Sequence, residues 1–115
     1  MEYRNLNRVF CFNKAFRAWR REGGYDSLKG SHINIMLSMT QFGTGGVGLV
    51  GMFCHLKRFG RQLSYNEIQV FCNELCGYGL VSISGRYPAV YSLTVAGRNA
   101  LNALEKRCRE TRYDR

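Results

Sequence analysis

The stretch ELCGYGLVSISGRYPAVYSLTVAGRNAL, residues 74–101, changes its periodicity twice. It begins as the end of a helix, continues as two alternating runs on either side of Gly85-Arg86-Tyr87-Pro88, and becomes helical again at Thr94. Alternation of apolar and polar residues is typical of strands, and the central four residues favour a turn. The stretch therefore predicts a β-hairpin between two helices, with an arginine at its tip.

The helix before this hairpin has a well-defined start. Ser64 is a good N-cap, and Glu67 stands three residues later, which together form the capping-box pattern. Ile68, Phe71, Cys72 and Leu75 follow at helical spacing, so we expect a helix over 64–78 that ends near Gly77 or Gly79.

Helical periodicity also covers the rest of the chain. Residues 5–22 predict an amphipathic helix through Val9, Phe12, Phe16 and Trp19, and Phe10 widens its apolar surface. Ser31 is the expected cap of a second helix, which ends near Gly43 and has Ile33, Met36, Leu37 and Thr40 on its inner face.

Two further helices complete the prediction. The segment GTGGVGLVG (43–51) lacks the lysine and hydroxyl of a phosphate loop, so we interpret it as a flexible connection. It leads into a helix over about 48–59 with an apolar side made by Val50, Phe53, Cys54 and Leu56. Thr94 caps the last helix, whose inner stripe is Leu101, Leu104 and Cys108.

These elements predict one domain over residues 1–115, mainly α with a small β-hairpin (α+β). The short turn FGRQL (59–63) separates two helices, which suits a helix-turn-helix over 48–79. A hairpin directly after it, over 80–94, is the wing of a winged helix-turn-helix.

From Ser64 to Leu104 the chain resembles winged-helix regulators of the MarR-like type. The resemblance is carried by SYNEIQVFCNELCGYG, by the exit GLV, by the hairpin and by YSLTVAGRNALNAL. It implies a small dimeric transcription regulator that binds double-stranded DNA sequence-specifically. The recognition helix 64–78 would enter the major groove, and the wing would meet the backbone or the minor groove. The terminal helices, 5–22 and 95–110, would pair two subunits.

Carried over to this sequence, the resemblance assigns amides to base edges and basic residues to phosphates. Asparagine and glutamine amides bond adenine through its N6 and N7 atoms, and positive charge supplies much of the affinity for DNA. The expected DNA-binding residues are Lys57, Arg58, Arg61, Ser64, Tyr65, Asn66, Gln69, Asn73, Arg86 and Tyr87.

The recognition helix departs from the usual pattern, because it has no lysine or arginine and carries Glu67 and Glu74. This leaves open a second hypothesis, a winged-helix module that binds an acidic protein partner without reading DNA. Tyr65, Tyr78 and Tyr87 would then serve as its contact residues.

Composition sets the remaining expectations. Seventeen basic and eight acidic residues give a net charge of +9, which favours an acidic partner, with nucleic acid as the first candidate. No apolar run is long enough to span a membrane and MEYRNLNRVF lacks the apolar part of a signal peptide, so we expect a cytoplasmic protein without a membrane partner.

The five cysteines and two histidines do not form a recognisable site. The cysteines contain no CxxC pair, and reduced, buried thiols are the simplest interpretation, so no metal or cofactor is expected. No nucleophile or acid partner is evident for either histidine, so the chain is not expected to be an enzyme. Cys11 in RVFCFNKAF resembles the redox cysteine of the hydroperoxide-sensing MarR-like branch; the alternative is a thiol packed between Phe10 and Phe12.

Overall fold

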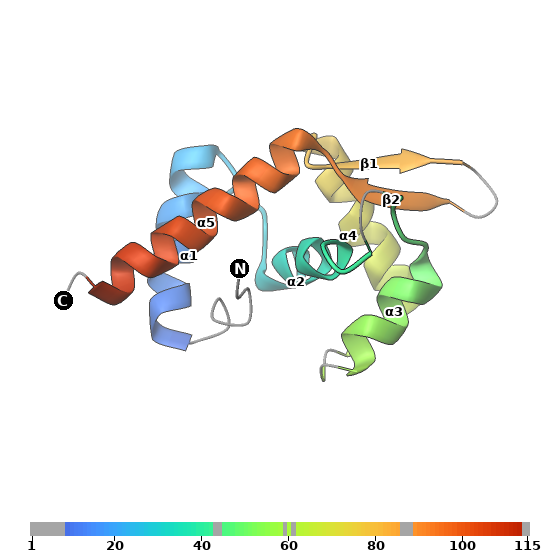
Figure 1. Ribbon diagram of the computed structural model, residues 1–115, viewed down its shortest axis with the longest axis horizontal. Coiled ribbons are helices and arrows are strands. Elements are labelled where there is room, and N and C mark those ends of the chain that lie inside the picture. Colours follow the sequence, from blue (N-terminus) through green and yellow to red (C-terminus); the bar gives the residue numbers. More distant parts are fainter. Residues whose placement is uncertain (1–8, 43–44, 59, 61, 86–88, 114–115) are drawn as a thin grey trace.

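The computed structural model describes residues 9–42, 45–58, 60, 62–85 and 89–113, with side chains described between residues 14 and 110 of these ranges. The described part has an α+β fold of five helices and one antiparallel two-stranded hairpin, which is compatible with a winged helix (Figure 1). In chain order the elements are α1 (Val9–Gly23), α2 (Gly30–Met39), α3 (Leu49–Arg58), α4 (Tyr65–Gly77), β1 (Val81–Ser84), β2 (Val90–Leu93) and α5 (Val95–Tyr113).

The molecule is elongated, with extents of 49 × 27 × 23 Å, and different secondary-structure elements form its two ends. Helices α1 and α5 pack against each other at one end, and α3 and the hairpin lie at the other (Figure 1). Helix α2 lies between them and contacts α3, α4 and α5. One core of buried apolar residues runs through all of these elements.

The terminal helices are joined by specific contacts within one chain. Trp19 Nε1 donates a hydrogen bond of 2.8 Å to the carbonyl oxygen of Ala100, and Glu22 forms an ion pair with Arg107. The stripe predicted for the last helix is confirmed, since Leu101, Leu104 and Cys108 are all buried. On α1 the side chains buried by the chain itself are Ala15, Phe16 and Trp19.

Both predicted ends of α4 are confirmed. Ser64 Oγ accepts a hydrogen bond from the Glu67 backbone N–H, and the Glu67 carboxylate accepts one from the Ser64 N–H, which completes the capping box. At the other end Gly79 has a φ of +75°, and the N–H groups of Gly79 and Leu80 bond the carbonyls of Cys76 and Leu75. This Schellman arrangement requires the left-handed conformation that glycine adopts at least cost.

The hairpin and its joint with α5 form as the alternation predicts. Strand β1 pairs with β2 in a register that places Val81 opposite Leu93 and Ile83 opposite Tyr91. Thr94 caps α5, because its Oγ1 accepts from the Gly97 N–H at 2.9 Å; the same hydroxyl donates to the Gly79 carbonyl at 2.6 Å. Thr94 thus fixes the start of α5 against the end of α4.

Part of the glycine-rich segment 43–51 is ordered against the hairpin instead of being a flexible connection. Val47 forms an antiparallel bridge with Tyr91, and each residue's N–H donates to the other's carbonyl oxygen at 2.8 Å. A Cβ at Gly46 would lie 2.5 Å from Val90 Cγ1, so a glycine at this position lets the segment approach β2 closely.

The predicted start of the second helix is wrong. Helix α2 begins two residues earlier, at Gly30, with Lys29 as its N-cap, and Ser31 lies inside it. The Lys29 N–H donates to the Nδ1 atom of His32, so the side chain at the third helical position bonds back to the N-cap backbone, as in a capping box. The helix ends at Met39 with Thr40 as its C-cap, and the expected end near Gly43 falls outside the described residues.

The expected inner faces of two helices need correction. In α2, Ile33 and Met36 are buried as predicted, whereas Leu37 and Thr40 are only half-buried. In α3, Leu56 is buried as predicted, together with Met52, whereas Val50 is 63% exposed and Cys54 is exposed. The four residues at the start of the predicted first helix, 5–8, lie outside the described part of the chain.

Candidate nucleic-acid interface

Helix α4 has one buried side and one polar side. Four side chains on the polar side are exposed, and their spacings of three and four residues place them on one face. They are Asn66, Gln69, Val70 and Asn73. The opposite side enters the core through Ile68, Cys72 and Leu75, which are fully buried. Since its inner side is held firmly, the outer face is presented on a rigid helix.

Three of the four exposed residues on this face carry amides that are available to a ligand. Within the described ranges, the side-chain amides of Asn66, Gln69 and Asn73 make no hydrogen bond to the rest of the chain. Each amide offers two N–H donors and one carbonyl acceptor. The face can therefore form paired hydrogen bonds with a partner that presents a donor next to an acceptor.

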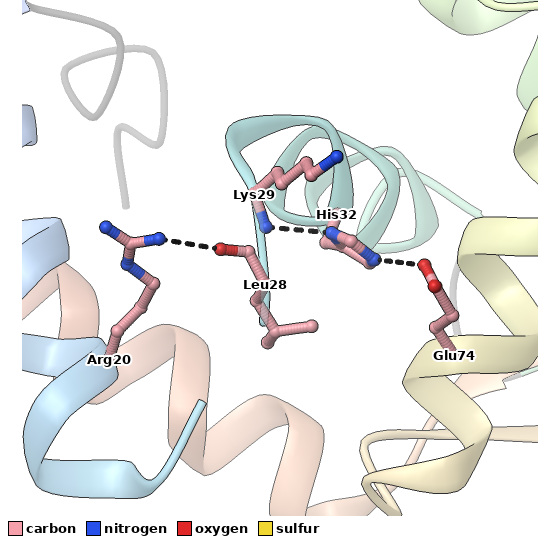
Figure 2. Close-up of polar contacts among 5 residues, drawn as sticks. All are labelled: Arg20, Leu28, Lys29, His32 and Glu74. Carbon is pink, nitrogen blue, oxygen red and sulfur yellow. Dashed lines mark hydrogen bonds and ion pairs between the residues drawn. The ribbon is translucent and has the colours of Figure 1, made fainter. Parts of the chain in front are cut away.

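Both carboxylates of α4 are engaged by the chain itself. Glu67 Oε1 accepts from the Ser64 N–H at 2.9 Å as part of the capping box. Glu74 Oε1 lies 2.7 Å from Nε2 of His32, whose side chain is only 2% exposed (Figure 2). The Nδ1 atom of His32 accepts from the Lys29 N–H, so the Nε2 atom carries the proton that is donated to Glu74. The two acids thus have structural roles, and the outer face itself has no formal charge.

Basic residues lie beside the first turn of α4. The Tyr65 ring stacks on Phe53 of α3, with centroids 4.4 Å apart and an angle of 15° between the rings. The Lys57 Nζ atom lies 5.9 Å from the centroid of Phe53, so the three side chains form one continuous group. Lys57 and Arg58 are both exposed in the last turn of α3. Lys57 and Tyr65 thus contact the same ring, that of Phe53.

Three of the remaining predicted site residues lie outside the described part of the chain. Arg61, Arg86 and Tyr87 fall in segments that the structure does not describe. Cys11 lies in the first turn of α1, but its side chain is also outside the described set. Ser64 is exposed at the N-cap of α4, and its hydroxyl oxygen is occupied as the acceptor for Glu67.

Sequence reasoning did not single out Val70, which is 53% exposed on the amide face. The next residue, Phe71, belongs to the apolar side of α4. In the sequence, Val70 and Phe71 therefore look like parts of the same apolar side. The helical spacing was the available signal, because Val70 stands four residues after Asn66 and three before Asn73.

Burial shifts the pKa values of three titratable groups near the core toward their uncharged forms. Burial raises the pKa of the Cys72 thiol to about 12, and burial also raises the pKa of Cys76, so both thiols stay protonated at neutral pH. Burial, and then the charge of Arg58, lowers the pKa of His55, which keeps this ring neutral. In the described ranges, no three side chains of His, Cys, Asp or Glu gather closely enough to hold a metal ion.

Within the part of the chain that the structure describes, no helix combines the length and the apolar character needed to cross a membrane. Comparison with known proteins adds no further constraint, because no family model, no curated protein and no solved structure matches this chain.

Proposed function

We propose that this protein binds double-stranded DNA sequence-specifically, as a small dimeric transcription regulator. Helix α4 would lie in the major groove, and the connection between β1 and β2 would meet the backbone or the minor groove. The observation that carries this function is the outer face of α4, whose exposed amides have no partner in the described chain. The first turn of the same helix is linked to Lys57 of α3 through the stacked rings of Tyr65 and Phe53.

The order of the elements supports a winged helix-turn-helix as the scaffold. Helices α3 and α4 are consecutive and pack together, and the hairpin follows α4 directly. The bridge between Val47 and Tyr91 adds a short third segment to the hairpin ahead of α3. In a helix-turn-helix the second helix reads the major groove, whose width admits an α-helix. Here that helix is α4, the one with the amide face.

The chemistry of the surface supports DNA over other acidic partners. A side-chain amide pairs with adenine because it presents a donor and an acceptor at the spacing of adenine N7 and N6. Lys57 and Arg58 are placed to meet phosphates, which position a protein on the duplex without reading its sequence. The net charge of +9 supplies the general attraction that non-specific binding needs.

Selection of duplexes from a random pool, at low and at moderate salt, tests this function. We expect a defined sequence to be enriched at both salt concentrations, and retention of all duplexes to weaken as salt rises. Failure to retain any duplex at low salt would contradict it. That result would favour the alternative function, a winged-helix module that binds an acidic protein through the same surface.

A further inference from the structure

Val70 occupies the middle of the amide face. Asn66 lies one helical turn before it and Asn73 one turn after it, and Gln69 is its immediate neighbour. All four side chains are exposed, with Val70 at 53%. Any surface that docks on these amides must therefore also meet the two methyl groups of Val70.

In a DNA major groove, an apolar side chain has one favourable contact on the base edges, the 5-methyl group of thymine. The nitrogen and oxygen atoms of the base edges are hydrogen-bond donors or acceptors, which lose hydration against a valine without gaining a partner. A valine flanked by amides is thus suited to an A·T pair, because the amides can bond adenine while the valine contacts thymine.

The length of the face sets how many base pairs it can cover. From Asn66 to Asn73 the helix advances seven residues, or about 10 Å at 1.5 Å per residue. Base pairs are stacked about 3.4 Å apart, so this stretch matches about three consecutive pairs. Val70 lies near the middle of that span.

Helix α4 lacks the side chains that most often read guanine. The helix has no lysine or arginine to bond guanine. Its two carboxylates each use the Oε1 atom within the chain, for the Ser64 N–H and for His32. The face itself consists of three amides and a valine, side chains that can together match an A·T pair.

We propose that α4 reads a run of about three A·T pairs, in which Val70 packs against a thymine 5-methyl group and the amides of Asn66 and Asn73 bond neighbouring adenines. This assignment rests on the DNA binding proposed above and adds to it the base composition of the target and the residue that detects thymine.

Replacement of thymine by deoxyuridine tests the role of Val70, since it removes only the methyl group. The probe is the duplex enriched from the random pool, synthesised with deoxyuridine at one thymine position at a time. Binding is measured for the full-length protein, for Val70→Ala and for Val95→Ala. Val95 is a matched control, because it is 72% exposed in the first turn of α5. Alanine is the better helix former, so both variants are expected to fold.

We expect deoxyuridine at one or two adjacent positions to weaken wild-type binding roughly three- to tenfold, as for one lost methyl contact. Val70→Ala should bind the thymine duplex as weakly as the wild type binds the deoxyuridine duplex. Its affinity should be the same for both duplexes. Val95→Ala should behave as the wild type.

Two results would overturn the assignment while leaving DNA binding intact. One is wild-type binding that does not change at any deoxyuridine position; the other is a Val70→Ala variant that keeps the full response to the methyl group. If no duplex binds at all, the proposed function itself fails, and the role of Val70 fails with it.

Discussion

His32 and Glu74 join the start of α2 to the last turns of α4 by a hydrogen bond of 2.7 Å between Nε2 and Oε1 (Figure 2). The same histidine caps α2 through its Nδ1 atom, so one buried ring serves two helices. Arg20 adds a neighbouring link, because its Nη1 atom donates to the Leu28 carbonyl at 3.1 Å. Together these bonds tie α1, the connection to α2, and α4 into one unit.

Glu74→Ala removes the acceptor of this bond and leaves a buried N–H of His32 without a partner. We expect the free energy of unfolding to fall by about 2 kcal/mol, because an unsatisfied buried donor loses its hydration without compensation. Glu74→Gln retains a carbonyl acceptor and should lose about half as much. Urea unfolding at pH 7 measures both.

The matched control for these variants is Glu110→Ala, which removes an exposed carboxylate from α5. It should change stability by less than about 0.5 kcal/mol. Equal losses for Glu74→Ala and Glu110→Ala would show that the bond to His32 does not stabilise the fold.

Gly97→Ala tests the close approach between α5 and the start of the hairpin. A Cβ at this position would lie within 2.1 Å of the Leu80 carbonyl oxygen, so the backbone would have to move. We expect a loss of about 3 kcal/mol in the free energy of unfolding. Thermal unfolding followed by circular dichroism provides the measurement.

Gly77→Ala is the matched control, because it lies in α4 and a Cβ there meets nothing within 4 Å. That substitution should stabilise the protein by about 0.5 kcal/mol through helix propensity. If both alanine variants melt at the temperature of the wild type, the contact with Leu80 does not restrict this position.

The raised pKa of the buried Cys72 thiol predicts a loss of stability at alkaline pH. Burial, and then the nearby Cys76, raises its pKa from 9.0 to about 12. Above pH 9 the unfolded chain releases this proton while the folded chain keeps it, so unfolding becomes more favourable as pH rises. The free energy of unfolding should fall by about 1.4 kcal/mol per pH unit from this group.

Urea unfolding at several pH values between 9 and 12 measures this loss. Cys72→Ala should be less stable at pH 7 but should show a shallower decline above pH 9. Raised pKa values at Cys76 and Tyr91 add to the decline in both proteins. An identical pH dependence for wild type and variant would contradict a buried, protonated Cys72.

Local sequence signals predicted the elements whose contacts are also local. The capping box of Ser64 and Glu67 and the cap at Thr94 each depend on groups three residues apart, so the sequence contains both partners. The hairpin likewise forms between adjacent alternating runs.

Contacts between distant parts of the chain had no such signal. His32 and Glu74 are 42 residues apart, and Trp19 and Ala100 are 81 apart. The side chain that bonds the backbone at the start of α2 is His32, not Ser31, and the ring of His32 is also held by Glu74 of α4. The bridge of Val47 likewise depends on Tyr91, which is distant in the sequence. For the candidate site, the arrangement of the amides could be predicted, because spacing alone places Asn66, Gln69 and Asn73 on one face of a helix.

A homodimer remains a prediction, formed by residues 5–22 and 95–110 of two chains. The first helix has consecutive apolar residues, Val9–Phe12, and its one helical neighbour in the described chain with extensive contacts is α5. Sedimentation equilibrium at micromolar concentration should give twice the 13.2 kDa mass of the chain. A mass of one chain under these conditions would rule the dimer out.

Substitutions on α4 and α3 should separate sequence reading from general attraction. Gln69→Ala or Asn73→Ala should weaken binding to the enriched duplex by about 1–3 kcal/mol and leave a scrambled duplex nearly unaffected. Lys57→Ala, and likewise Arg86→Ala in the connection of the hairpin, should weaken binding to both duplexes about equally. Each should also reduce the salt slope by about 0.9, as for one lost phosphate contact.

The central claim is that the outer face of α4 reads bases, and equilibrium titration of the enriched and the scrambled duplex at two salt concentrations tests it most directly. We predict that the Gln69→Ala and Asn73→Ala variants lose preference for the enriched duplex while their salt slopes stay at the wild-type value. Unchanged affinities for both duplexes in both amide variants, with Lys57→Ala still weaker on each, would show that α4 does not read DNA.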